Sequence, residues 1–280
     1  MCVRWGSSTS EYFKVTNGVR QGSILSPYFF NVYVDDLSKK LNSLDIGCVV
    51  GALIINHILY ADDLVLISPS SRGLYRLLRE CEKYGLEFDI VFNANKSYVM
   101  CFMSNSTSNF RIPDFYFNAN LIPLVNSTKY LGHYLCDTGS DALDIDRQRK
   151  KIFIQGNSLI RKFYMCTVDV KLTLFQSFIA PMYTAHLWKR YSNNDILKLY
   201  RAYHNTLKMF LGLSKREHTS PICAFLNVRT CAAVIRNFIF HFMVRLRNSS
   251  NNILQAILGT SICYNSSIWK HWRSLLYTNV

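Results

Sequence analysis

The sequence predicts an α+β fold, with strands mainly in the first half of the chain and helices in the second. Short apolar runs bounded by turn residues recur up to about residue 137, which is typical of strands and hairpins. From Ser140 onward, apolar residues recur at helical spacing, with Lys and Arg on the polar faces. The charge changes at the same place, because residues 1–137 carry 12 basic and 12 acidic side chains whereas residues 138–280 carry 20 and 6. We therefore predict two domains, 1–137 and 138–280.

The composition indicates a globular protein with a polyanionic partner. Hydrophobic residues make up 49% of the sequence, which excludes a disordered tail, and the net charge of +14 lies in the second domain. Such a charge favours nucleic acid or an anionic membrane surface. The N-terminus lacks the apolar run of a signal peptide, and the apolar stretch 46–67 is broken by polar residues, so neither predicts a membrane segment. The 9 cysteines form no Cys-x-x-Cys pair and are predicted to be free thiols.

The first elements are predicted to be a hairpin followed by a helix. Candidate strands near 2–5 and 11–15 flank a turn rich in Gly and Ser. Ser26-Pro27 is a typical helix start, because Ser caps the helix and Pro suits its first turn. An apolar stripe then continues to about Leu44, where we expect the helix to end.

Two adjacent carboxylates on this helix have an ordinary explanation. Asp35 and Asp36 are each followed four residues later by a lysine, Lys39 and Lys40. Side chains at this spacing face each other on a helix and form ion pairs. We therefore interpret them as a solvated helix face rather than as catalytic carboxylates.

The middle of the chain alternates strands with one helix. The predicted elements are two strands between Cys48 and Ile67, a helix from Ser71 to about Tyr84 that Gly85 ends, and strands near 97–103, 114–124 and 129–136. Helices follow from Ser140 onward.

An acidic pair lies between two apolar runs at Tyr60-Ala61-Asp62-Asp63. The flanking strands would fix a hairpin in a sheet, with both carboxylates at its turn. Neighbouring carboxylates repel each other unless a cation neutralises them, and Mg²⁺ favours carboxylate and phosphate oxygens. Such a pair suits phosphoryl transfer with two metal ions. The alternative is a purely structural turn, in which Asp is common.

Four segments resemble the ordered motifs of reverse transcriptases from non-LTR (LINE-type) retroelements. Residues 60–63 are similar to the acidic box, motif C, and 17–37 to motif B over nearly its full length. Residues 92–97 resemble the lysine-bearing motif D, and 129–133 resemble motif E, the primer grip. The resemblance is close over 1–137 and looser beyond. It implies a partial polymerase palm with an antiparallel sheet, followed by a mainly helical thumb and C-terminal region.

The resemblance also implies roles for particular residues. Asp62 would be the essential metal ligand, supported by Asp63, with Mg²⁺ or Mn²⁺ as the cofactor. Lys96 would lie near the nucleotide phosphates as a general acid toward the leaving pyrophosphate. The residues implied in nucleotide and template binding are Arg20, Gln21, Gly22, Tyr60 and Ala61, and those implied in the primer grip are Tyr130, Leu131 and Gly132. The alternatives are a solvated Arg20, a surface Lys96 and an ordinary buried strand around Tyr130.

One expected group has no counterpart in the sequence. The family places a further metal-binding aspartate before motif B, whereas the only acidic residue before Gly18 is Glu11. The polymerase fingers would also lie further upstream. We therefore expect this chain to be a C-terminal part of such an enzyme, with another N-terminal polymerase part as a partner and weak or no polymerisation by itself.

The implied partners are an RNA template, a DNA primer and deoxynucleoside triphosphates, with no membrane. Basic side chains of 138–280, interleaved with aromatics, are expected to grip the nucleic acid; they include Arg147, Arg149, Lys150, Lys151, Arg161, Lys162 and Lys208. The family and the lack of a signal peptide imply a location in the nucleus and cytoplasm. A non-catalytic nucleic-acid-binding remnant of such an element is the alternative function. A membrane-surface protein is a third, but it needs one strongly amphipathic helix, and here the charge is spread over several.

Overall fold

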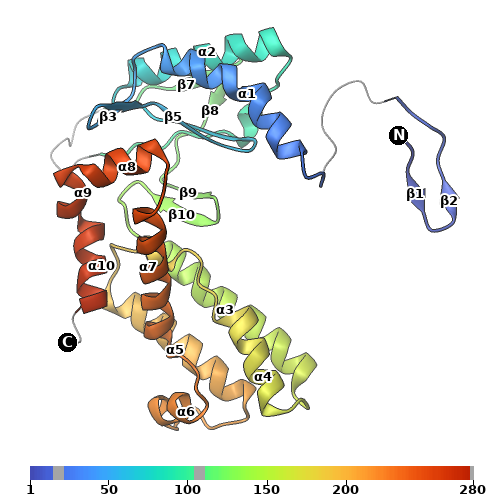
Figure 1. Ribbon diagram of the computed structural model, residues 1–280, viewed down its shortest axis with the longest axis vertical. Helices are drawn as coiled ribbons and strands as arrows, with labels where there is room; N and C mark the ends of the chain where they lie inside the picture. Colours follow the sequence, from blue (N-terminus) through green and yellow to red (C-terminus); the bar gives the residue numbers. More distant parts are fainter. Residues whose placement is uncertain (15–21, 104–110, 278–280) are drawn as a thin grey trace. The chain divides into compact units, whose positions relative to one another are not determined.

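The computed structural model describes residues 1–14, 22–103 and 111–277. The chain forms two compact units (Figure 1). The first unit comprises Met1–Lys96 and Phe115–Leu121, and the second comprises Ser97–Asp114 and Ile122–Val280. Helices and small antiparallel sheets occur together, so the predicted α+β class is confirmed.

The first unit combines two long helices with short hairpins. Its elements are β1 (Arg4–Trp5), β2 (Ser8–Thr9), α1 (Ser26–Asn42), β3 (Cys48–Val50), β4 (Leu53–Ile55), β5 (His57–Tyr60), β6 (Asp63–Leu66), α2 (Ser71–Phe88), a 3₁₀ turn (Ala94–Lys96), β7 (Phe115–Phe117) and β8 (Asn120–Ile122), whose last residue belongs to the second unit. Within the described residues every sheet is a separate two-stranded ribbon, and not the single antiparallel sheet that the resemblance implies.

The core of the first unit lies between α1 and α2. Leu37 and Leu41 of α1 and Leu77 and Tyr84 of α2 are completely or almost completely buried. The Tyr84 hydroxyl donates a hydrogen bond of 2.7 Å to the carbonyl of Tyr33 on α1. Burial of these side chains provides most of the force that holds the helices together, and the hydroxyl contact fixes their register.

Several predicted boundaries in this unit need correction. The helix predicted from Ser26 is confirmed as α1, but its N-cap is Leu25, so Ser26 is the first helical residue and not the cap. The N-terminal hairpin turns over Gly6-Ser7, so its second strand is at 8–9, whereas the predicted strand at 11–15 has no strand in its described part, 11–14. The segment between Cys48 and Ile67 contains four strands rather than the two predicted, because a short turn divides each apolar run into the two strands of a hairpin.

Gly85 does not end α2, which continues to Phe88. The residue that ends the helix is Asp89, whose φ of 54° lies in the left-handed region. A side chain at position 85 would meet the Ile90 carbonyl at 2.7 Å, so glycine is there for a close approach of the backbone.

Of the two ion pairs predicted on the exposed face of α1, one forms and the other does not. Lys39 pairs with Asp35 at 2.7 Å, which confirms that ion pair. Lys40 does not pair with Asp36, because it reaches across to Glu87 of α2 and lies over the Tyr84 ring. A partner on the neighbouring helix has replaced the local one.

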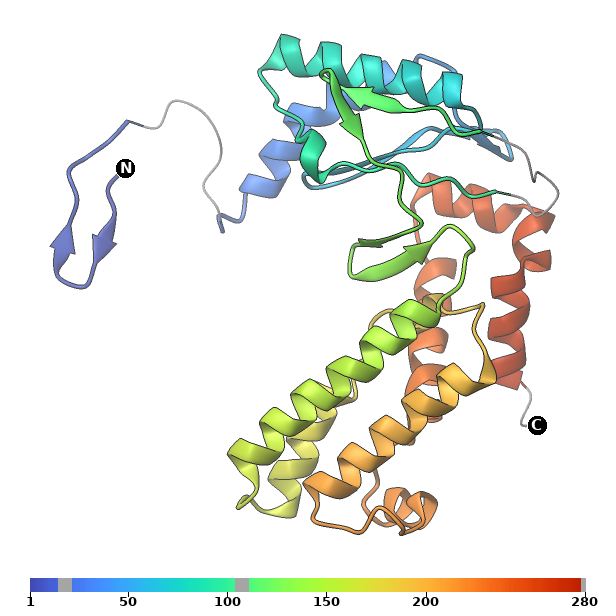
Figure 2. The ribbon, with the colours of Figure 1, turned by 180° about the vertical axis from the view of Figure 1, so that it is seen from behind.

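From Ser127 onward the second unit forms a hairpin and then helices (Figure 2). Its elements are β9 (Ser127–Tyr130), β10 (His133–Cys136), α3 (Ala142–Phe163), α4 (Val168–Leu174), a π-helical turn (Phe175–Ile179), a 3₁₀ turn (Ala185–Leu187), α5 (Asn193–Phe210), α6 (Thr219–Phe225), α7 (Cys231–Arg247), α8 (Asn252–Gly259), α9 (Ser261–Asn265) and α10 (Ser267–Tyr277). The predicted helical character is confirmed. The strand predicted near 97–103 is only a single bridge between Val99 and Leu124.

A large apolar core holds the second unit together. Phe175, Trp188, Leu199, Tyr203 and Ile239 are almost wholly buried in one cluster. The 9 cysteines are all free, as predicted. The compact second unit includes the β9–β10 hairpin, whereas the predicted division at 137/138 is a functional one and stays a prediction. No helix in the described part of the chain is both long enough and apolar enough to cross a membrane.

The contact between α3 and α5 depends on a glycine. A Cβ atom at Gly156 would lie 2.3 Å from the methyl carbon of Thr206, a buried residue on α5. We therefore expect Gly156→Ala to lower the free energy of unfolding by about 1–2 kcal/mol, because overpacking outweighs the gain in helix propensity. Denaturant unfolding measures the change.

Two further variants control for this effect. Thr206→Ser removes the obstructing methyl group, so the double variant should be more stable than the sum of the single changes predicts. Gly259→Ala has open space around the added carbon and should be neutral or slightly stabilising. Equal effects of the changes at Gly156 and Gly259 would contradict the close contact.

Candidate functional site

The two predicted catalytic carboxylates lie at the tip of the β5–β6 hairpin. Tyr60 pairs with Asp63, so Ala61 and Asp62 form a two-residue turn. We call Tyr60–Asp63 the acidic turn. Ala61 has a φ of 51°, a conformation that residues other than glycine rarely adopt. All four residues are exposed, and neither Asp has an ion-pair partner within the described part of the chain.

This geometry fits a divalent cation. Adjacent exposed carboxylates without a cationic side chain offer hard oxygen ligands and an uncompensated negative charge. Among residues 1–14, 22–103 and 111–277, no group of three or more His, Cys, Asp or Glu side chains gathers into a metal cluster. By itself the acidic turn would supply only part of a coordination shell, and Mg²⁺ in proteins commonly takes waters or phosphate oxygens as its other ligands.

A buried polar side chain fixes the base of the same hairpin. Asn56 is 1% exposed, and its Nδ2 donates a 2.7 Å hydrogen bond to the carbonyl of Leu41 on α1. Its own carbonyl accepts a 2.7 Å bond from the amide of Ile67, at the far end of β6. Both ends of the hairpin are thus tied to one point on α1.

His57 extends this network to Ser38. Its Nδ1 lies 2.6 Å from Asn56 Oδ1, and its Nε2 lies 2.7 Å from the Ser38 hydroxyl. Because Asn56 Nδ2 must face the Leu41 carbonyl, its Oδ1 faces the ring, and Nδ1 must carry the proton. Nε2 then accepts from Ser38. Burial lowers the pKa of His57, which favours this neutral form.

The other predicted residues of the first unit are only partly described. Gly22 is exposed, with a φ of 77°. Arg20 and Gln21 lie outside the described residues. Lys96 is exposed at the end of the 3₁₀ turn, and no ion pair or hydrogen bond joins it to the acidic turn among the described residues.

The predicted primer-grip residues form another tight turn, in the second unit. Tyr130 pairs with His133, which leaves Leu131 and Gly132 as the turn. Their φ values of 44° and 84° match a type I′ turn, the form that suits the twist of hairpins. The Leu131 side chain is 50% exposed at the tip. It is therefore available for contact, as a primer grip requires.

Sequence reasoning missed the residues that hold this turn in place. His133 is buried against two carboxylates, Asp141 and Asp144, at the start of α3. The signal available in the sequence was a histidine directly after the turn and two aspartates three residues apart at the start of a helix. Neither is distinctive without the fold.

The predicted basic surface divides into free and engaged cations. Arg147 pairs with Asp144, and Arg149 and Lys150 pair with Asp146. Lys208 is 5% exposed and donates to the carbonyls of Lys215 (3.1 Å) and Glu217 (2.8 Å). Its predicted contact with nucleic acid is therefore wrong, because its ammonium group organises a loop of its own chain.

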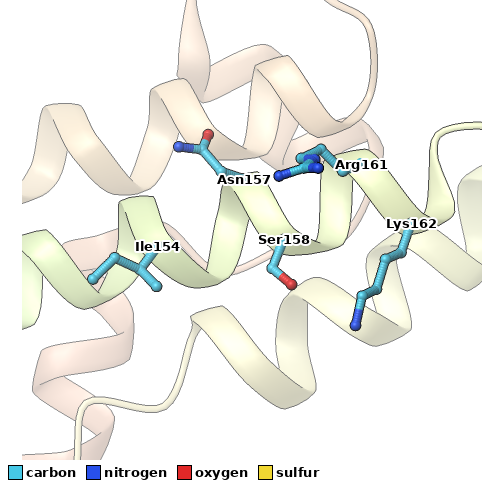
Figure 3. A pocket seen from close by; sticks show the side chains of 5 residues that line it. All are labelled: Ile154, Asn157, Ser158, Arg161 and Lys162. Carbon is cyan, nitrogen blue, oxygen red and sulfur yellow. The ribbon is translucent and has the colours of Figure 1, made fainter.

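A groove along α3 contains free cations (Figure 3). It has a volume of about 430 Å³ and is lined by Ile154, Asn157, Ser158, Arg161 and Lys162. Neither Arg161 nor Lys162 has an ion-pair partner in the part of the chain that the structure describes. Two cations beside an amide and a hydroxyl provide the donors that phosphate oxygens accept. We call this the α3 groove.

Comparison with known proteins agrees with the sequence motifs. Residues 2–135 match the family described as reverse transcriptase (RNA-dependent DNA polymerase). The chain is 34% identical over 137 residues, 47% of its length, to the Pol polyprotein of the type-2 retrotransposable element R2DM of Drosophila melanogaster. It is 26% identical over 224 residues (76%) to that of a type-1 element R2 of Popillia japonica. It is 23% identical over 265 residues (90%) to the RNA-directed DNA polymerase of the mobile element jockey of Drosophila melanogaster.

The chain spans only part of each relative. The matched segments cover 13%, 37% and 28% of those three proteins. The family match includes the acidic turn, the segment from Gly22 into α1, and the β9–β10 turn.

We expect Asn56→Ala to loosen the acidic turn. The change removes one donor from the Leu41 carbonyl, which still accepts from the amides of Ser43 and Leu44, so the lost side-chain hydrogen bond costs about 0.5–1.5 kcal/mol. Amide hydrogen exchange over His57–Ile67 should become faster, and unfolding should occur at lower denaturant concentration. Asn120→Ala is a matched control, because the exposed Asn120 side chain bonds only to the nearby carbonyl of Asn118. Unchanged exchange in the Asn56 variant would show that the hairpin does not depend on this anchor.

Proposed function

Because residues 2–135 belong to the reverse transcriptase (RNA-dependent DNA polymerase) family, we propose that the chain is part of an RNA-directed DNA polymerase of a non-LTR retroelement. Its reaction is template-directed nucleotidyl transfer with two metal ions. The observation that carries this proposal is the acidic turn, where Asp62 and Asp63 lie at the tip of an anchored hairpin and have no cationic partner among the described residues.

In this proposal Asp62 is the principal metal ligand and Asp63 a supporting carboxylate. Bound Mg²⁺ or Mn²⁺ would activate the attacking oxygen and stabilise the leaving oxygen. The chain's contribution is to hold both carboxylates at one place before the metal arrives. The bonds from Asn56 to Leu41 and Ile67 provide this preorganisation.

Further residues have proposed roles around that centre. Tyr60, Ala61 and Gly22, together with Arg20 and Gln21, contact the nucleotide and template. Lys96 donates a proton to the pyrophosphate, and its exposed ammonium group is free to reach a phosphate. The partners are an RNA template, a DNA primer and deoxynucleoside triphosphates.

The second unit binds the duplex in this proposal. Tyr130, Leu131 and Gly132 contact the primer backbone, and the exposed Leu131 tip is suited to that contact. Arg161 and Lys162 in the α3 groove bind phosphates. An RNA–DNA hybrid is close to A-form, so recognition depends on backbone and shape rather than on base sequence.

We propose that residues 1–280 alone polymerise weakly or not at all. The acidic turn offers two carboxylates, and no third metal-binding side chain joins them among the described residues. This observation favours the alternative function as well, a non-catalytic nucleic-acid-binding remnant of such an element. Both functions share the duplex-binding surface and differ only in turnover.

The proposal is tested by measuring binding and primer extension in parallel on an RNA template with a DNA primer. Binding should weaken steeply as salt rises, and Arg161→Gln with Lys162→Gln should reduce the slope of log K against log salt by about 2, one for each lost phosphate contact. The matched control is Arg149→Gln with Lys150→Gln, where both cations are already paired with Asp146 and the slope should change less.

Primer extension with Mg²⁺ or Mn²⁺ should be weak or absent both for the chain and for its Asp62→Asn variant. The control variant is Asp35→Asn, which removes a carboxylate on α1. Strong extension by the chain that Asp62→Asn abolishes would contradict the proposed impairment. Absence of salt-sensitive duplex binding would contradict the proposed function itself.

A further inference from the structure

A buried histidine helps to attach the Leu131–Gly132 turn to the start of α3. His133 directly follows the turn and is 8% exposed. Its Nδ1 lies 3.1 Å from Asp144 Oδ2, and its Nε2 lies 3.6 Å from Asp141 Oδ1. Both distances lie within the range of an ion pair. The ring therefore lies between two carboxylates that precede and begin α3.

Those carboxylates are themselves held rigidly. Asp144 is completely buried and accepts hydrogen bonds of 2.7 Å from Trp188 Nε1 and from the Thr184 hydroxyl. Asp141 accepts 2.7 Å and 2.8 Å bonds from the backbone amides of Lys189 and Arg190. Neither carboxylate can follow a displaced histidine without breaking these bonds.

The first residues of β10 share this anchor. The amide of Tyr134 donates a 3.2 Å hydrogen bond to Asp144 Oδ1, which Arg147 also binds through its guanidinium at 2.7 Å. A side chain and the next backbone amide thus meet the same carboxylate. Two attachment points fix a direction as well as a position, so the turn leaves the unit at a set angle.

The histidine carries a positive charge at neutral pH. Burial alone would lower its pKa, but Asp141 and Asp144 outweigh burial and raise the pKa of His133 to about 9. Burial would raise the pKa of the Asp144 carboxyl, yet His133, Trp188, Thr184 and Arg147 hold that pKa well below its usual range. Burial lowers the pKa of the neighbouring His186 to about 4, so His186 is neutral there. The stabilisation is full below about pH 6.5 and is lost as the pH rises through about 9.

We propose that His133 is a positioning residue, whose buried ring between Asp141 and Asp144 sets the angle at which the Leu131–Gly132 turn meets the primer strand. This inference rests on the proposed function, in which that turn contacts the primer. The histidine touches no nucleotide itself. It acts through Leu131, whose exposed side chain is two residues away.

The test places p-benzoylphenylalanine at position 131 of the full chain and maps its photo-cross-links to an RNA–DNA template–primer. Cross-links should concentrate on a few primer nucleotides. With His133→Gln they should spread along the strand and the main product should fall about tenfold, because removal of one partner leaves the buried charges uncompensated. Amide exchange over Ser127–Cys136 should become faster, while α5 retains its protection. His241→Gln, at an exposed position on α7, is the matched control.

The outcomes separate this inference from the proposed function. An unchanged cross-link pattern or unchanged exchange in His133→Gln would overturn the positioning role. A pattern that changes equally with His241→Gln would overturn it too. If the chain with the cross-linker at position 131 and His133 retained forms no cross-links and binds no duplex, the proposed function fails and the primer role of His133 fails with it. Exchange over Ser127–Cys136 would then still measure whether His133 anchors the hairpin.

Discussion

The hydrogen bond from the buried Asn56 side chain to the Leu41 carbonyl is the constraint on which the candidate site depends. A hairpin of two four-residue strands is marginal in water, and the acidic turn adds two like charges and a strained Ala61 at its tip. The hydrogen bonds of Asn56 at the base of the hairpin offset this low stability. Leaving Asn56 unbonded in the interior would be costly, so the hairpin can close only where α1 presents its partner. The contacts that fix the position of Asp62 and Asp63 are thus made at Asn56, about six residues before Asp62.

A histidine helps to hold each of the two proposed functional turns, in the neutral form near one turn and in the charged form near the other. Each presents a non-glycine residue at positive φ, Ala61 in one and Leu131 in the other, and each is followed or preceded by an anchored histidine. His57 is held neutral by burial and hydrogen bonds. His133 is held charged by two carboxylates. The first anchor weakens as the pH falls below about 6.5, and the second weakens as it rises through about 9, so both are intact near neutral pH.

Local sequence patterns predicted the elements but not the contacts between them. The helix at Ser26, the acidic hairpin and the helices after Ser140 follow from a proline in a first helical turn, from hairpin turns and from periodicity, all of which are local. Gly85, Lys40 and Lys208 were interpreted wrongly because the partner of each lies outside its own helix: the carbonyl of Ile90 beyond the helix end, Glu87 on α2, and the carbonyls of a loop. The anchors Asn56, Asp141 and Asp144 were missed for the same reason. A polar residue in a strand or at a helix start shows its importance only when its burial is known.

Paramagnetic line broadening by Mn²⁺ tests the central claim most directly, because it detects a metal at the acidic turn whether or not the chain turns over. The amide signals of the isotope-labelled chain would be followed during titration with Mn²⁺ in the presence of an RNA–DNA template–primer. Carboxylates that lack a cationic partner should bind the ion first. The account predicts that signals of Tyr60–Leu64 broaden before those of Asp35 and Asp36, and that Asp62→Asn removes the effect. Broadening at the helix face of α1, with none at the acidic turn, would contradict it.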